Sequence, residues 1–252
     1  MQYEIQLLKM GQCEVPGPEV YWMSKWNTWE TLHFWMVLIR GGGKNILINT
    51  GPPRDLAPMN AVWSEAIDPR SQFVREDAER PENALKTAGL TPAEIDHVLI
   101  TPLQAYATGN IALFTNAQIC ISRRGWIEDF HAPKFDMHIP RKLRIPDEPL
   151  KYLVMDAPEK LRLLEDEDEI LPGLRCFWTG THHRSSMAYV IDTVRGTVIA
   201  SDCFFKYRNV EERIPLGIME SLEECMLAYK RIRKEADILL PLYDPAVIER
   251  IG

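Results

Sequence analysis

Short apolar runs bounded by turn residues recur along the chain, and they predict a protein rich in β-strands. Each run is dominated by branched and aromatic residues, as buried or half-buried strands are. The runs lie at residues 3–8, 34–39, 45–48, 97–101, 118–121, 174–178, 188–192, 197–201 and 238–241. Glycine-containing segments at residues 40–44 and 193–196 join two pairs of runs, and they predict antiparallel hairpins.

Helical patterns lie between these runs. Residues 91–94 (TPAE) place threonine at an N-cap, proline at the first helical position and glutamate where it closes a capping box. Residues 220–236 predict a helix lying on a sheet, since charges surround apolar positions at helical spacing, namely Leu222, Met226, Tyr229 and Ile232. The acidic residues 165–169 lack the spacing and glycine of an EF-hand and predict a solvated turn. Hairpins mixed with covering helices indicate α/β layers with mixed sheets.

Bulk composition predicts a globular protein with one domain over residues 1–252. Hydrophobic residues make up 46% of the chain and charged residues 26%. The net charge of -7 disfavours a nucleic-acid partner. The first residues lack the basic start and apolar run of a signal peptide, and no stretch reaches the length of a membrane span, so we expect a cytoplasmic protein without a membrane partner. The five scattered cysteines predict reduced thiols.

Tryptophans are concentrated near the start of the chain. Trp22, Trp26, Trp29 and Trp35 lie within the first 35 residues. A small pair of strands cannot readily bury so many indole rings. We therefore expect some of them to form a pocket wall or a partner surface and the others to pack in the core.

Four segments carry an ordered set of strands, turns and polar residues. They are residues 45–51 (NILINTG), residues 94–110 (EIDHVLITPLQAYATGN), residues 178–186 (WTGTHHRSS) with the strand that follows, and the strand ending at Asp202 together with residues 240–245 (LPLYDP). In this order and spacing, residues 33–249 resemble the metallo-β-lactamase superfamily, most closely its N-acyl-homoserine-lactonase and glyoxalase II-like branch. The resemblance implies an αββα sandwich in which helices flank two mixed β-sheets.

The resemblance also implies a two-metal site that this chain has largely lost. In the family, histidines and aspartates of a His-x-His-x-Asp-His motif, a later histidine, a bridging aspartate and a last histidine bind two metal ions. The matching positions here are Pro102, Gln104, Tyr106, Ala107, His182, Asp202 and Tyr243. Only His182 and Asp202 keep the residue types of the ligands. Phe205 stands where family lactonases place a tyrosine, and Tyr207 follows it.

The replacements are poor metal ligands. Pro102 and Ala107 offer no side-chain donor, Gln104 is a neutral amide, and the two tyrosines would coordinate only as phenolates. We therefore expect no cofactor. The alternative is one Zn, Fe or Mn ion on the residual ligands His182 and Asp202, with a further ligand drawn from Gln104, His183, His33, His131 or His138.

The sequence is consistent with three functions. The first is a non-catalytic binding or partner subunit in a homo- or hetero-oligomer, for example with an active relative, in which Pro102, Gln104, Ala107 and His183 border the former metal pocket. The second is a metal-free enzyme whose catalytic candidates are His182, Asp202, Tyr106 and Tyr243, with Asp202 orienting His182 as a base. The third is a hydrolase of a lactone, ester or thioester with a rewired single-metal site. An open, polar pocket between the two tyrosines would favour the second hypothesis, whereas a pocket packed shut would remove it.

Overall fold

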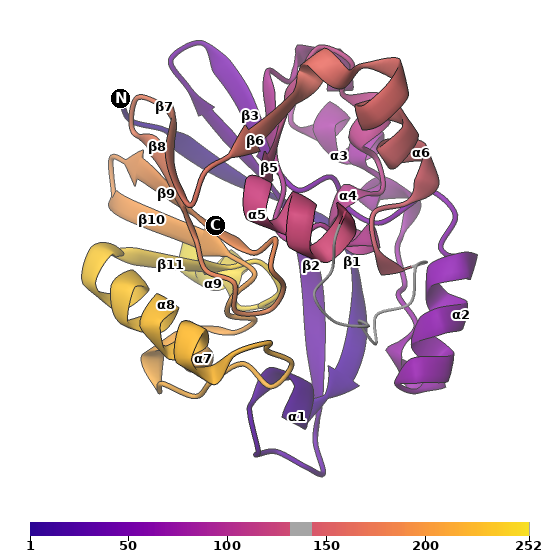
Figure 1. The fold of residues 1–252 in the computed structure, drawn as a ribbon, viewed down its shortest axis with the longest axis vertical. Helices are drawn as coiled ribbons and strands as arrows, with labels where there is room; N and C mark the ends of the chain where they lie inside the picture. The colour runs from indigo at the N-terminus through magenta and orange to yellow at the C-terminus, as the bar shows by residue number, and fades with distance from the viewer. Residues whose placement is uncertain (132–142, 252) are drawn as a thin grey trace.

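The computed structural model describes residues 1–131 and 143–251, and its strands form two mixed β-sheets (Figure 1). The first sheet has the order β1-β2-β3-β4-β5-β6 and the second has the order β11-β10-β9-β8-β7. The strands of the first sheet are β1 (Glu4–Pro16), β2 (Trp29–Gly41), β3 (Lys44–Ile48), β4 (His97–Leu99), β5 (Gln118–Ser122) and β6 (Leu161–Leu164). Those of the second are β7 (Glu167–Leu171), β8 (Leu174–Trp178), β9 (Met187–Thr193), β10 (Gly196–Ser201) and β11 (Ile238–Pro241).

Helices flank both sheets. They are α1 (Gly17–Val20), α2 (Ala57–Ala66), α3 (Pro81–Thr87), α4 (Ala105–Thr108), α5 (Arg123–Gly125), α6 (Asp147–Lys151), α7 (Tyr207–Glu211), α8 (Leu222–Glu235) and α9 (Val247–Ile251). The helix α8 packs near β10, whereas α3 packs near β1. The end of the β1–β2 hairpin that carries α1 projects from the body of the molecule (Figure 1). The predicted sandwich of two mixed sheets flanked by helices is confirmed.

Most predicted strands are present, and the differences have local causes. The strands β8 and β11 match their predicted ranges, and both predicted hairpins are antiparallel pairs. The runs at residues 3–8 and 34–39 belong to longer strands, β1 and β2, whose register shifts between Lys9 and Gln12. The strand predicted at 97–101 ends at Leu99, because Thr101 turns to bond Asn49 and Asp202.

The acidic run was wrongly predicted as a turn throughout. Its last three residues begin β7, an edge strand in which Glu167 and Glu169 are exposed and Ile170 is buried. An edge strand tolerates charges on its open side. The acidic residues of β7 therefore masked the alternation of buried and exposed positions that identifies a strand. The strand β6 was also missed.

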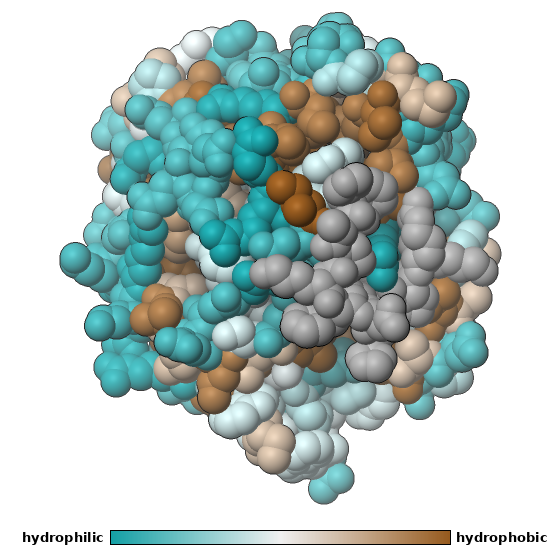
Figure 2. Space-filling model, in the orientation of Figure 1, coloured by the Kyte–Doolittle hydropathy of each residue, from teal (hydrophilic) through white to brown (hydrophobic). Residues whose placement is uncertain are grey.

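The predicted helices are present in modified form. Residues Pro92–Glu94 form a single 3-10 turn with the expected capping box. The helix α8 begins after Ser221, which caps it, and buries Cys225, Ala228, Tyr229 and Ile232, while Leu222 is exposed. All five cysteines are buried free thiols. Within the described part of the chain, no helix is long and apolar enough to span a bilayer. The face seen in Figure 2 is mostly hydrophilic, with hydrophobic residues grouped in the region of α6.

Three hydrogen bonds connect the two sheets. The Trp35 indole N–H of β2 donates to the carbonyl of Asp244 at 3.0 Å, and the His33 N–H donates to the carbonyl of Tyr243 at 3.0 Å. The Tyr189 hydroxyl of β9 donates to the carbonyl of Ile100 at 2.9 Å. These bonds hold the segment after β11 against β2, and so they place the Tyr243 ring.

Candidate functional site

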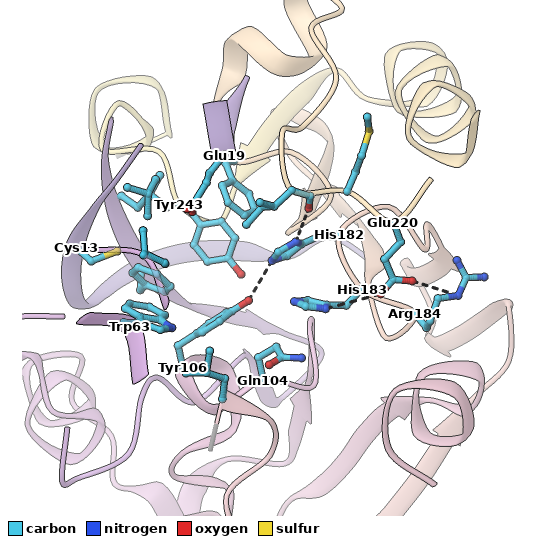
Figure 3. A pocket seen from close by; sticks show the side chains of 18 of the residues that line it. Cys13, Glu19, Trp63, Gln104, Tyr106, His182, His183, Arg184, Glu220 and Tyr243 are labelled. Carbon is cyan, nitrogen blue, oxygen red and sulfur yellow. Dashed lines mark hydrogen bonds and ion pairs between the residues drawn. The ribbon is translucent and has the colours of Figure 1, made fainter. Parts of the chain in front are cut away.

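A pocket of about 900 Å³ lies where β1, β2, α1, α2, α4 and the loops after β8 and β11 meet. Its wall is largely apolar, and it contains five aromatic rings, those of Phe34, Trp63, Tyr106, Phe205 and Tyr243. Such a volume and such walls are typical of sites that bind small organic molecules. Figure 3 shows the polar side chains that converge on the same space.

The aromatic rings form one continuous wall. The Phe34 ring lies 4.9 Å from Tyr243 and 5.3 Å from Tyr106, measured between ring centroids. Phe205 lies 4.7 Å from Tyr243, and Trp63 lies 6.0 Å from Tyr106. Because tilted and edge-on contacts at these separations are favourable, the wall is held in place without a ligand.

His182 lies in this pocket in a defined tautomer. Its Nδ1 is 2.9 Å from the carbonyl of Ile218, which can only accept, so Nδ1 carries the proton. Burial lowers the pKa of His182 to about 4, so the ring is neutral at physiological pH. Its Nε2 then accepts a hydrogen bond from the Tyr106 hydroxyl at 3.2 Å. The Tyr106 oxygen therefore offers only acceptor capacity to a ligand.

Two other polar atoms of the pocket are buried without a well-formed hydrogen bond. They are the hydroxyl of Tyr243, whose nearest polar contact is the Tyr106 hydroxyl, and Nδ1 of His183, which lies 4.0 Å from a carboxylate oxygen of Glu220; neither atom makes a well-formed hydrogen bond with a described residue. Tyr243 is 2% exposed and His183 is 6% exposed. Burial raises the pKa of Tyr243 well above its usual value and lowers the pKa of His183 well below its usual value, so both side chains are neutral. We name Tyr106, His182, His183 and Tyr243 the pocket cluster.

Asp202 belongs to a second, closed group of polar residues, which we name the Asp202 cluster. Its carboxyl accepts hydrogen bonds from the hydroxyl of Thr101 and, at 2.5 Å, from that of Ser186. Thr101 also accepts from the N–H of Met187 at 2.8 Å, and Asp202 is fully buried. The predicted pairing of His182 with Asp202 is therefore wrong, because each has other partners. Burial raises the pKa of Asp202 to about 7.

The donor set does not fit the two metal ions that the resemblance implies. No cluster of three or more histidine, cysteine, aspartate or glutamate side chains suitable for a metal occurs in the described ranges. Asp202 is committed to two hydroxyl groups, and His182 directs Nε2 at a tyrosine. His33 is not among the residues that line the pocket. The side chain of His131 and all of His138 lie outside the described residues.

The charged residues of the pocket differ in their partners. Arg184 donates to Glu128 at 3.0 Å and to Glu224 at 2.6 Å, and its Nε lies 3.7 Å from Glu220. Glu19, from α1, also lines the pocket but makes no ion pair or side-chain hydrogen bond with a described residue. Burial raises the pKa of Glu19 to about 7. Figure 3 shows Glu19 on the Tyr243 side and Arg184 on the His183 side.

The other predicted site residues are distributed unevenly. Gln104 lines the pocket beside the pocket cluster, whereas Pro102 and Ala107 are buried outside its wall. Tyr106, Tyr243, His182 and His183 line it together, as the sequence motifs had placed them. The aromatic replacements Tyr106 and Tyr243 line an open pocket, so they do not close the space at these positions.

The tryptophan prediction was correct only in part. Trp35 is a core residue, and Trp22 and Trp26 are 42% and 63% exposed. None of the first four tryptophans lines the pocket, and the indole that does is Trp63 of α2. Trp63 was missed because α2 has no strong periodic pattern, and nothing in its own segment points toward a site. A partner surface at Trp22 and Trp26 stays a prediction.

Comparisons with known proteins agree with these observations. No family model matches the chain. An N-acyl homoserine lactonase of Bacillus cereus is 21% identical over 207 residues, which cover 81% of this chain and 76% of that protein. An N-acyl homoserine lactonase of Bacillus thuringiensis is 20% identical, with the same coverage.

Solved structures share the fold. An N-acyl homoserine lactone hydrolase with the product N-hexanoyl-L-homoserine at its catalytic metal center has a TM-score of 0.79 and 20% identity, over 100% of this chain and 98% of that one. A hydrolase of the beta lactamase superfamily, AbOPH, has a TM-score of 0.68 and 15% identity, over 97% and 88%. The chain therefore has the metallo-β-lactamase fold, and its likeness to the N-acyl homoserine lactonases is confirmed.

Proposed function

We propose that this chain is a metal-independent binding protein for a small amphiphilic molecule. The observation that carries the proposal is a largely apolar pocket of about 900 Å³ whose wall contains two polar atoms without a well-formed hydrogen bond to a described residue, Tyr243 Oη and His183 Nδ1. Buried polar groups without partners are costly. A ligand that hydrogen-bonds to both atoms while covering the aromatic wall would remove that cost.

Binding is favoured over metal-free acid–base catalysis by the arrangement of the polar groups. A base needs an orienting group and a proton to accept. Here His182 is oriented by a backbone carbonyl, its Nε2 already accepts from Tyr106, and burial holds its pKa at about 4. The carboxyl of Asp202 lies in a separate closed cluster. Recognition by neutral donors and acceptors is the chemistry that these groups support.

The relatives suggest the first probes. They are N-acyl homoserine lactonases, and one solved neighbour contains N-hexanoyl-L-homoserine while another contains N-decanoyl-L-homoserine. These molecules join an apolar chain to a polar head, as the pocket requires. We therefore propose as the ligand an amphiphile held by the aromatic wall and the pocket cluster, and the acyl lactones are its first probes.

The test is a titration with N-hexanoyl and N-decanoyl homoserine lactone, followed by calorimetry and by fluorescence of Trp63 in the pocket wall. We expect saturable binding, unchanged by a chelator, with the lactone recovered intact. Replacement of Tyr243 by phenylalanine should weaken binding roughly fivefold to tenfold through one lost hydrogen bond. The matched control is Tyr152→Phe, which lies outside the pocket.

Three results would contradict the proposal. Absence of binding for every amphiphile tried would remove the binding function. Loss of binding on chelation, with stoichiometric metal in the untreated protein, would restore a metal site. Steady opening of the lactone ring by the metal-free protein, lost in His182→Ala, would instead establish a hydrolase.

A further inference from the structure

Glu19 is the one pocket carboxylate, among the described residues, that lacks a nearby cation. Glu128 is bonded by Arg184, and Glu220 lies 3.7 Å from the same guanidinium. Glu19 has no such neighbour, although it faces the same pocket. Because an unpaired carboxylate in an apolar space is unfavourable, the position calls for a partner that the described chain does not supply.

The backbone around Glu19 is held rigidly at the pocket. Its carbonyl accepts from the N–H of Ile218 at 3.0 Å, and the next carbonyl, that of Val20, accepts from the Asn209 side chain at 2.8 Å. Gly217 approaches so closely that a Cβ there would lie 1.7 Å from the carbonyl oxygen of Pro18. The carboxylate therefore projects from a fixed point of the pocket wall.

Among the described residues, the other charges of the pocket do not neutralise Glu19. Glu19, Glu128 and Glu220 line it with Arg184 as the accompanying cation, and both histidines are neutral. The aromatic rings of Phe34, Tyr243 and Phe205 line the same pocket, and the face of an aromatic ring attracts a cation. The pocket is thus suited to a positive group attached to an apolar chain.

We infer that Glu19 forms a cation subsite, and that the ligand is an amphiphile whose protonated amine contacts Glu19 while its apolar chain lies along the aromatic wall. This inference rests on the proposed binding function and specifies the chemistry of the ligand. By the same charges, an anionic amphiphile is expected to bind more weakly than a neutral or cationic one.

The test compares three probes that share one chain, namely octylamine, 1-octanol and octanoate, in calorimetric titrations at pH 8. We expect octylamine to bind about tenfold more tightly than octanol or better, and octanoate to bind most weakly. In Glu19→Gln the preference for octylamine should fall to about that of octanol. Glu223→Gln removes the same charge from the exposed face of α8 and should keep the preference.

A pH series adds a second readout. Octylamine stays protonated below about pH 10, as a lysine side chain does. Its affinity should rise from pH 6 to pH 8, because Glu19 loses its proton with a pKa of about 7. Burial also raises the pKa of Glu220 to about 7, so Glu220 titrates over the same range. Cys13, Tyr106 and Tyr243 stay protonated there because burial raises their pKa values. The part of the increase in octylamine affinity that is absent in Glu19→Gln is therefore caused by Glu19.

The outcomes separate the inference from the function on which it rests. If all three probes bind and octanol or octanoate matches octylamine, the cation subsite is wrong and the binding function stands. If Glu19→Gln, folded as judged by its denaturation curve, keeps the full preference, Glu19 is not the subsite. If neither these probes nor the acyl lactones bind, the proposed function itself fails.

Discussion

The Asp202 cluster and the pocket cluster both include positions where the resemblance places metal ligands, and they differ in how fully their hydrogen bonds are satisfied. Asp202 accepts from two hydroxyls, and Thr101 in turn accepts from a backbone N–H. In the pocket cluster, by contrast, Tyr243 Oη and His183 Nδ1 make no well-formed hydrogen bond with a described residue. One cluster is closed and buried, whereas the other faces a large open space.

The difference indicates that these positions have two separate roles in the fold. Around Asp202, the hydroxyl groups of Thr101 and Ser186 surround the carboxyl, and they join the end of β4 to β9 and β10. Around His182, aromatic side chains line a space that stays open. A buried polar network that is fully satisfied rigidifies a fold, whereas unsatisfied groups beside a cavity indicate a ligand. The closed cluster is therefore expected to stabilise the fold, and the open one is the candidate for the proposed binding.

The largest expected effect comes from breaking the closed cluster. In Asp202→Ala the hydroxyls of Thr101 and Ser186 lose their acceptor inside the core, and we expect the free energy of unfolding to fall by about 3 kcal/mol or more. Urea denaturation followed by circular dichroism measures this. Glu65→Ala, on the exposed face of α2, should change stability by about 0.5 kcal/mol or less. Equal losses of unfolding free energy in the two variants would show that the hydrogen bonds of the Asp202 cluster do not stabilise the fold.

The titration of the same carboxyl sharpens the comparison. Burial, with a smaller contribution from the nearby Asp129, raises the pKa of Asp202 from about 3.9 in an unfolded chain to about 7. A raised carboxyl pKa favours the folded state most at low pH, so this contribution declines as the pH rises from about 4 to about 7. Asp202→Asn has no carboxyl to titrate. The decline in unfolding free energy over that range should therefore be smaller in Asp202→Asn than in the wild-type protein, and an identical decline would contradict the raised pKa.

The sequence could predict most of the fold because strand patterns and motif order are local. Residues 45–51 predict the strand and turn that Asn49 completes, and Asn49 does adopt a positive φ and bond Thr101. The charged strand β7 could not be recognised, since its buried positions are few and it lies at a sheet edge. Most of the described structure thus follows from short-range periodicity.

The site was predictable in its membership but not in its hydrogen bonds. The motif positions brought Gln104, Tyr106, His182 and Tyr243 together correctly. Their hydrogen-bond partners lie far away in the sequence. Asp202 accepts from Thr101, and His182 donates to the carbonyl of Ile218. Glu19 and Trp63 reach the pocket through the tertiary arrangement of α1 and α2 alone. No motif spacing contains that information.

The smallest expected change in stability comes from replacing two tyrosines of the pocket cluster. The informative result is whether each replacement raises or lowers the free energy of unfolding. Tyr106→Phe removes a hydroxyl that donates to His182 and should lower the free energy of unfolding by about 1 kcal/mol. Tyr243→Phe removes a buried hydroxyl without a well-formed hydrogen bond, so the unliganded protein should be unchanged or more stable by about 0.5 kcal/mol. Thermal and urea unfolding of both variants without ligand provide the measurement. A loss of stability in Tyr243→Phe as large as that in Tyr106→Phe would mean that the Tyr243 hydroxyl is already bonded, and the pocket cluster would then be as closed as the Asp202 cluster.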